Sequence, residues 1–395
     1  MTQTKHIPLA LLVPLLVFVA ARADDDQNGS LSTYKLVTTI SIPDLVGFDI
    51  SWVDSESARY YLADRGTGNT PATPRIDVID TDNNRLLDPI PMPKDANGMP
   101  TIAPNGVVAI HRTGSDDEED HPGTLVVGAS NSSAIFFDLA HPLAPPVVVP
   151  TGGKGRADEL AYDPRDHIIL IANDRDQDLF VTSISTVSPP GVLGKIFYDG
   201  SVPGNPKSTG GIEQPVWDGK TKKFYLAIPS TVANPNGEVD EIDPVTPDPM
   251  HPTITRIFKT SCGPAGLVLI PGQRLMTSCG DVLDIHTGTV VHTVTPTVGG
   301  DELWFNRGDD RVYFGGGTDR ISVPVVRGLS PFNLITTLKV GNLMVTPPHT
   351  THSVAADSEN NKIFVPVSHE GVKVYTAEED NDGGNDNDHG DHHDN

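Results

Sequence analysis

The stretch Gly-Ile-Glu-Gln-Pro-Val-Trp-Asp at residues 211–218, followed by Phe-Tyr-Leu-Ala at residues 224–227, is the clearest version of a phrase that recurs along this chain. It places an acidic residue before a short apolar strand, and a polar turn before a second strand. Looser versions return about every fifty residues. Short alternating runs bounded by Gly, Pro, Asn and Asp, without the 3.6-residue apolar period of a long helix, indicate an all-β protein.

The repeated units predict a seven-bladed β-propeller, because each period holds about four short strands. Residues 34–40 match no unit start, but they resemble residues 334–340, which we expect to form the outer strand of blade six. The N-terminal strand is therefore predicted to become the outer strand of blade seven and to close the ring. A two-layer β-sandwich is the alternative, but it would not explain seven equivalent entrances. These entrances begin near residues 47, 103, 156, 211, 262, 300 and 351.

The two ends of the chain differ in composition from the repeats. Residues 1–23 combine Lys5, a short apolar run and a small-x-small site, which predicts a signal peptide, with an uncleaved anchor as the alternative. We expect the propeller over residues 24–376, secreted or periplasmic and outside the membrane after cleavage. Residues 377–395 are almost wholly polar and predict a disordered tail. The tail's histidines, His389, His392 and His393, could bind metal weakly.

Charge and cysteine content limit the possible functions. The formal charge of −24 becomes −26 when residues 1–23 are removed, because Lys5 and Arg22 leave with them. Such an acidic protein lacks the basic surface that nucleic-acid binding needs, so we expect a monomer acting on a small molecule. Cys262 and Cys279 both follow Thr-Ser, and an oxidising compartment favours a disulfide between them. Buried thiols or soft metal ligands are the alternatives.

Polar residues occupy equivalent positions at the unit entrances and form the predicted site. Inner strands of a propeller converge on its axis, so these side chains should meet at one rim of the channel. Facing carboxylates repel unless a cation or a proton neutralises them, and their oxygens suit Ca²⁺, Mg²⁺ or Mn²⁺, with Zn²⁺ possible through histidine. The alternative is that they bond strand-end amides and water. The predicted ligands are Glu213, Asp301, Asp158, Asn105 and His352, with Phe48 at this position in the first unit and Glu159 or Glu302 as general base.

Two family resemblances follow from these residues. The repeats resemble YVTN-type propeller repeats across residues 36–375, and residues 213–217 resemble the Glu-x-Pro-x-Trp phrase of the gluconolactonase and senescence-marker-protein family. That resemblance implies that Glu213 and Asn105 bind a divalent metal, although Asp158 and Asp301 precede Glu where the family has Gly. It favours an enzyme, a metal-dependent hydrolase of lactones or esters. A non-catalytic propeller that binds a protein or small ligand, and a metal-dependent lyase or isomerase, are the alternatives.

Overall fold

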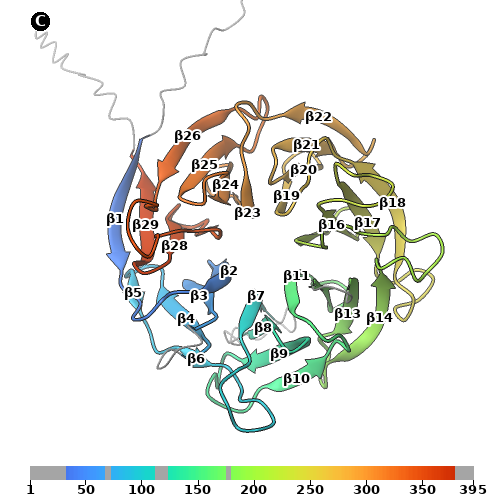
Figure 1. Cartoon of the computed structure of the whole chain (residues 1–395), viewed down its shortest axis with the longest axis horizontal. Coiled ribbons are helices and arrows are strands. Elements are labelled where there is room, and N and C mark those ends of the chain that lie inside the picture. The colour runs from blue at the N-terminus through green and yellow to red at the C-terminus, as the bar shows by residue number, and fades with distance from the viewer. Residues whose placement is uncertain (1–32, 67–72, 112–122, 175–178, 379–395) are drawn as a thin grey trace, which may run out of the picture. The chain divides into compact units, whose positions relative to one another are not determined.

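The chain folds into seven antiparallel sheets arranged as a ring around a central axis (Figure 1). The computed structural model describes residues 33–66, 73–111, 123–174 and 179–378, and every regular element in those ranges is a β-strand. The predicted all-β, seven-bladed propeller is confirmed. The predicted signal peptide, the acidic run at residues 116–120 and nearly all of the tail lie outside these ranges. Within them, no helical segment has the length and apolarity of a membrane span.

The blades follow one another in chain order, and each begins at its innermost strand. Blade one comprises β2 (Phe48–Asp54), β3 (Arg59–Asp64), β4 (Arg75–Asp80) and a split outer strand, β5 (Arg85–Leu86) and β6 (Ile90–Pro91). Blade two comprises β7 (Pro104–Ile110), β8 (Thr124–Ala129), β9 (Ser133–Asp138) and β10 (Val147–Pro150). Blade three comprises β11 (Ala157–Asp163), β12 (Ile168–Asn173), β13 (Phe180–Ser185) and β14 (Gly191–Phe197).

The remaining blades follow the same plan. Blade four comprises β15 (Pro215–Asp218), β16 (Lys223–Ile228), β17 (Glu238–Asp243) and β18 (Thr253–Lys259). Blade five comprises β19 (Leu267–Ile270), β20 (Arg274–Thr277), β21 (Asp281–Asp284) and β22 (Thr289–Thr293). Blade six comprises β23 (Gly300–Asn306), β24 (Arg311–Gly316), β25 (Ser322–Arg327) and β26 (Leu334–Lys339). Blade seven comprises β27 (Ala355–Ala356), β28 (Ile363–Val367), β29 (Gly371–Ala377) and, on its outside, β1 (Tyr34–Ile40).

The N-terminal strand closes the ring as the sequence predicts. β1 runs antiparallel to β29, with Tyr34 opposite Ala377 and Ile40 opposite Val372. Figure 1 shows the blue first strand lying against the red last one. Blades seven and one also pack against each other: the aromatic side chains of Phe364 in blade seven and Tyr60 in blade one stack with centroids 5.3 Å apart. Pairing the last sheet with the first strand leaves β29 no free edge.

A repeated turn explains why the phrase ends in Asp or Asn. The residue that ends the inner strand accepts hydrogen bonds from backbone amides two or three residues on, as Asp163 does from Arg165 at 2.8 Å. Such side-chain turns allow a left-handed residue before the second strand, and His167 has φ 56° there. The same pair of positions recurs around the ring, at Asp54 and Ala58, Asp218 and Lys222, Asn306 and Asp310, and Asp357 and Asn361.

Neighbouring blades are joined by apolar side chains from their facing sheets. Leu170 of blade three and Leu226 of blade four, for example, are fully buried in one cluster with Tyr198. Burying a side chain of that size contributes about 1.5–3 kcal/mol. These contacts recur at each seam, so the ring holds its inner strands at fixed positions around the axis.

Blade five has short strands throughout, and a disulfide joins the segments that flank its two inner strands. β19, β20 and β21 each span four residues, against six or seven for most strands elsewhere. Cys262 lies before β19 and Cys279 lies just after β20, and the structure bonds them across a separation of 17 residues. The predicted disulfide is confirmed, and the alternative of soft metal ligands is excluded for these sulfurs.

Removing this disulfide should lower the stability of the propeller. A loop of this length is expected to contribute about 3 kcal/mol by restricting the unfolded chain. The double variant Cys262→Ala with Cys279→Ala should therefore unfold at lower urea concentration than the wild type. Reduction of the wild type should give the same shift, and reduction of the variant should give none. An unchanged urea midpoint in the double variant would contradict this account.

Candidate functional site

A shared irregularity shapes the entrances of the inner strands. In blades one, two, three and six, two inner-strand residues lie opposite a single residue of the second strand. In blade three, for example, Ala157 pairs with Asn173 and Leu160 with Ile171, so Asp158 and Glu159 together face Ala172. A bulge of this kind redirects side chains at the end of a strand. In these four blades it places two adjacent residues at the entrance, before the regular part of the inner strand.

The first of these positions forms the ring that we call the rim. In blades one to six each member stands five residues before the last residue of its inner strand, as Asp158 does before Asp163 and Glu213 before Asp218. In blade seven His352 stands five residues before Asp357, which directly follows β27. In blade one this position belongs to Asp49 and not to Phe48, which corrects the predicted alignment. The predicted register aligned Trp52 of blade one with Tyr162 of blade three. In the structure Val53 pairs with Tyr60 as Tyr162 pairs with Ile169, so Val53 is the residue equivalent to Tyr162. The rim comprises Asp49, Asn105, Asp158, Glu213, Ala265, Asp301 and His352.

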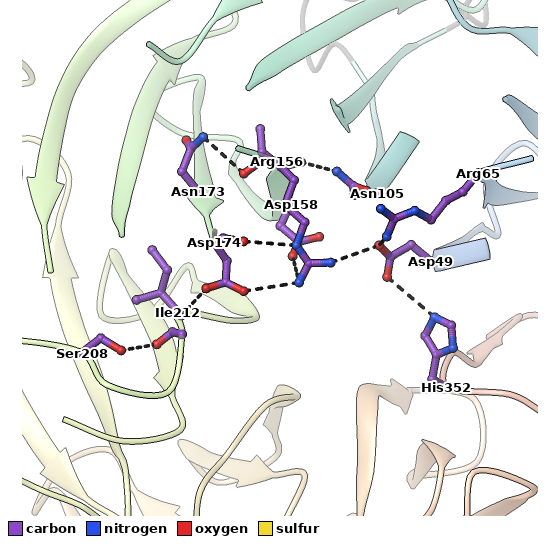
Figure 2. Close-up of polar contacts among 12 residues, drawn as sticks. Asp49, Arg65, Asn105, Arg156, Asp158, Asn173, Asp174, Ser208, Ile212 and His352 are labelled. Atoms are coloured by element: carbon purple, nitrogen blue, oxygen red, sulfur yellow. Dashed lines mark hydrogen bonds and ion pairs between the residues drawn. The ribbon is translucent and has the colours of Figure 1, made fainter. Parts of the chain in front are cut away.

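An arginine joins several of the rim acids. Figure 2 shows the guanidinium of Arg156 between three carboxylates. Its Nη2 lies 2.6 Å from Asp158 Oδ2 and 3.3 Å from Asp174 Oδ2, and its Nη1 lies 3.5 Å from Asp49 Oδ2. Asp49 also pairs with Arg65 at 2.8 Å. The network therefore connects blades one and three through charges that are mostly buried.

Sequence reasoning missed Asp49, Arg65, Arg156 and Asp174. Arg65 and Asp174 directly follow the second strands β3 and β12, at equivalent places in blades one and three. An antiparallel hairpin brings the end of its second strand beside the start of its first. The sequences Ala-Asp-Arg at residues 63–65 and Ala-Asn-Asp at 172–174 could therefore have indicated these two residues.

Three carboxylates meet at one point of the rim, and we call them the acid trio: Asp158, Asp174 and Glu213. One oxygen from each can be chosen so that all three lie within 4.8 Å of one another. The backbone amide of Ile212 donates to Asp174 Oδ1 at 3.2 Å, which ties blade three to the start of blade four. Among the described residues, the Glu213 carboxylate has no hydrogen-bond or ion-pair partner. The trio thus combines two carboxylates paired to Arg156 with one that is unpaired.

Burial and mutual repulsion dominate the titration of these groups. Burial, followed by Asp174 and Asp301, raises the pKa of Glu213 from 4.5 to about 8. Burial and the Asp49 charge likewise raise the pKa of Asp158 well above its usual range, although Arg156 opposes them. Burial also acts on Asp49, but His352, Arg65 and Arg156 outweigh it and lower its pKa. Arg156 therefore does not neutralise the whole cluster.

The other predicted ligands lie on the rim without joining the trio. The Asn105 side-chain amide donates to the carbonyl of Ala157 at 2.8 Å, and its buried Oδ1 has no partner in the described chain. His352 stacks on Phe48 with centroids 4.7 Å apart, and its Nε2 lies 3.7 Å from Asp49 Oδ1. Asp301 is half-buried and, within the described residues, unpaired; burial raises its pKa.

The glycine of the Pro-Asn-Gly sequence has a packing explanation. A Cβ atom on Gly106 would lie 2.3 Å from the backbone oxygen of Asp158, so blades two and three approach too closely there for any side chain. Glycine is therefore required at this bulge whether or not Asn105 binds a metal.

The two predicted catalytic glutamates occupy the second bulge position, below the rim. Glu302 accepts hydrogen bonds from the amides of Ser51 at 3.4 Å and Val354 at 3.3 Å, and from the Ser353 hydroxyl. It thus ties blade six to blades one and seven. Glu159 is only 5% exposed, and its Oε2 has no partner among the described residues. Burial raises the pKa of both glutamates well above the usual range.

Comparison with known proteins supports the fold alone. No protein-family model matches the chain, and no curated protein matches it by sequence. Among solved structures, a propeller chain in the crystal structure of a mitotic checkpoint complex matches with a TM-score of 0.59 and 12% identity. The match covers 95% of this chain and 99% of that one. At this identity the likeness carries no information on activity, because propellers host many functions.

The raised pKa of Glu213 should make stability depend on pH. The folded chain keeps a proton on Glu213 up to about pH 8, whereas the unfolded chain loses it near 4.5. The free energy of unfolding should therefore fall as pH rises from 4.5 to 8, by up to about 5 kcal/mol from this group. In chelator-containing buffer, the free energy of unfolding of Glu213→Gln, measured with urea, should depend less on pH than that of the wild type. Glu359→Gln, in an exposed turn, is the control, and parallel profiles for all three proteins would refute the assignment.

Proposed function

We propose that this protein is an exported, monomeric propeller hydrolase that acts on a small ester or lactone at the rim, with a divalent cation held by the acid trio. The observation that carries this proposal is the convergence of Asp158, Asp174 and Glu213, whose ligand oxygens lie within 4.8 Å of one another. The Glu-x-Pro-x-Trp resemblance at residue 213 supports the same site and indicates the substrate class.

The donor set fits a hard divalent cation. All three ligands are carboxylates, which suit Ca²⁺, Mg²⁺ or Mn²⁺ better than softer metals. The rim acids outnumber the arginines. Burial is the main cause of the raised pKa values of Asp158, Glu213 and Asp301, and neighbouring carboxylates raise them further despite Arg156. A cation at the trio would relieve that repulsion.

The chain's own residues at this site have separate roles. A bound divalent ion would polarise a carbonyl and lower the pKa of water. Asp301, an unpaired carboxyl within the described chain whose pKa is raised by burial, is the candidate to take and return a proton. Arg156 orients Asp158 and Asp174, and the His352 ring, stacked on Phe48, lies beside Asp49.

Asp301 suits the proton-transfer role better than Glu159 and Glu302, the two glutamates predicted from the sequence. Glu302 is held by donors from blades one and seven, so its carboxyl is committed to joining blades. Glu159 lies below the rim, where it lines the channel beneath the trio, and it is less exposed than Asp301. Proton transfer needs a group within hydrogen-bond reach of the substrate, and Asp301 is the more accessible acid.

A propeller that binds a ligand without catalysis is the second candidate. Arg156 favours it, because its guanidinium already pairs with Asp158, Asp174 and Asp49 and gives the rim a partly balanced charge in the absence of metal. In this alternative the rim is a set of ion pairs that fastens blades one and three.

Metal analysis and hydrolysis assays separate the two candidates. Protein lacking residues 379–395, which removes the tail histidines, should retain about one divalent ion and hydrolyse p-nitrophenyl acetate or δ-valerolactone. Glu213→Gln should lose the ion, with affinity falling at least tenfold. Asp301→Asn should retain the ion but lose about a hundredfold or more in kcat, because it removes the proton acceptor.

The matched control is Asn105→Ala, because Asn105 lies on the rim but outside the trio. It should leave metal content unchanged. A tail-free protein without metal, or a Glu213→Gln variant that binds metal as the wild type does, would overturn the hydrolase proposal and leave the binding propeller.

A further inference from the structure

The central channel contains a cavity below the rim that we call the aromatic cavity. Its volume is about 410 Å³, and the chain's three tryptophans, Trp52, Trp217 and Trp304, all line it together with Tyr162. These residues stand three or four positions after the rim residues of their strands. At about 3.3 Å per residue, the aromatic side chains lie roughly 10–13 Å along the channel from the rim.

The aromatic walls are held in place from behind. Trp52 and Trp304 meet edge to face with centroids 5.0 Å apart, and Trp217 packs against Phe224 at 4.7 Å. Tyr162 shares a hydrogen bond with His167 at 3.0 Å. All four side chains are nevertheless only partly buried. Large rings that are fixed yet still reach solvent are typical of a preformed ligand pocket.

The inner end of the cavity carries two carboxyl groups, and one of their oxygens is buried without a partner in the described chain. Glu159 and Glu302 both line it, and Glu302 Oε2 accepts hydrogen bonds from three donors. Glu159 Oε2 is buried and, within the described chain, lacks a partner. Gln214 also reaches the cavity, with its oxygen accepting the Leu267 amide at 2.7 Å. Glu159 is therefore the group that a ligand could satisfy.

We propose that the aromatic cavity binds a small organic cation, an ammonium carried on a flat apolar body, with the ammonium directed at Glu159 and the body between the tryptophan and tyrosine rings. This site is separate from the acid trio and does not depend on the hydrolase proposal.

Charge selects a cation over a neutral or anionic ligand of the same shape. Glu159 and Glu302 both place carboxyl groups at this cavity. An ammonium there favours their ionised form, and the resulting attraction acts in a confined space, where charge interactions are stronger than in water. Aromatic faces attract cations further, most strongly those of tryptophan. Arg307 also lines the cavity, but it is exposed, so solvent screens its charge.

Three probes with one phenyl body and different charge test the proposal on the full-length protein. Phenethylammonium, 2-phenylethanol and phenylacetate can each be titrated to millimolar concentration, the range expected for such small ligands. Binding should change tryptophan fluorescence, because every tryptophan of the chain lines the cavity. We expect the cation to bind at least about tenfold more tightly than the alcohol, and the anion most weakly.

Glu159→Gln keeps the side chain's shape and removes its charge. It should reduce the affinity for phenethylammonium to within about twofold of that for 2-phenylethanol. The affinity for 2-phenylethanol should stay unchanged, because the variant loses only the attraction between the carboxylate and the ammonium. Glu359→Gln should behave as the wild type. Trp217→Leu, at a half-exposed position, should weaken binding of the cation and of the alcohol alike. This variant tests the cavity if Glu159→Gln does not fold.

The wild-type series alone can overturn the proposal. Equal affinities for the cation and the alcohol, tighter binding of phenylacetate, or no saturable binding of phenethylammonium would each do so. Glu213→Gln should lose metal at the trio and still bind phenethylammonium. Failure of one proposal is therefore distinguishable from failure of the other.

Discussion

Closure of the ring is the constraint on which the rest of this structure depends. β1 pairs with β29, and the seven inner strands must then start side by side around one axis. Closure leaves the entrance side chains no room to separate, so Asp49, Asp158 and Glu213 face one another across the channel mouth. Unlike acids on an open surface, they cannot reduce their repulsion by moving apart. Arg156, protonation and any bound cation are the means left to stabilise them.

The channel is divided into a charged end and an aromatic end, and the bulge sets the boundary between them. A regular strand would turn adjacent side chains to opposite faces. The extra residue instead lets Asp158 stand at the rim while its neighbour Glu159 lines the cavity below. Beyond the bulge the strands become apolar, and Tyr162, Trp217 and Trp304 follow. In blade three the same local irregularity thus places Asp158 in the acid trio and the carboxyl group of Glu159 at the aromatic cavity.

The sequence predicted the architecture well and the site only in part, for different physical reasons. Strand spacing and turn residues are local signals, so seven blades and the closing strand at residues 34–40 could be predicted from them. Rim membership was also predictable where Asp158, Glu213 and Asp301 share a register. In blade one the prediction placed Phe48 at the rim position that Asp49 occupies, because Trp52 was aligned with the position that Val53 holds in the structure. The ion pair of Arg156 with Asp49 could not be predicted, because it depends on how blades one and three face each other across the channel.

The rim and the aromatic cavity share one electrostatic field, so binding at one affects binding at the other. Glu159 feels the charges of Asp158 and Glu213, and Glu213 feels those of Asp174, Asp301 and Asp49. Positive charge placed near any of these groups favours ionisation of the others, and ionisation of any one raises the pKa of the rest. A cation at the trio therefore lowers the negative potential offered to a cation below it. Because binding couplings are reciprocal, occupancy of the cavity weakens the attraction at the rim by the same free energy.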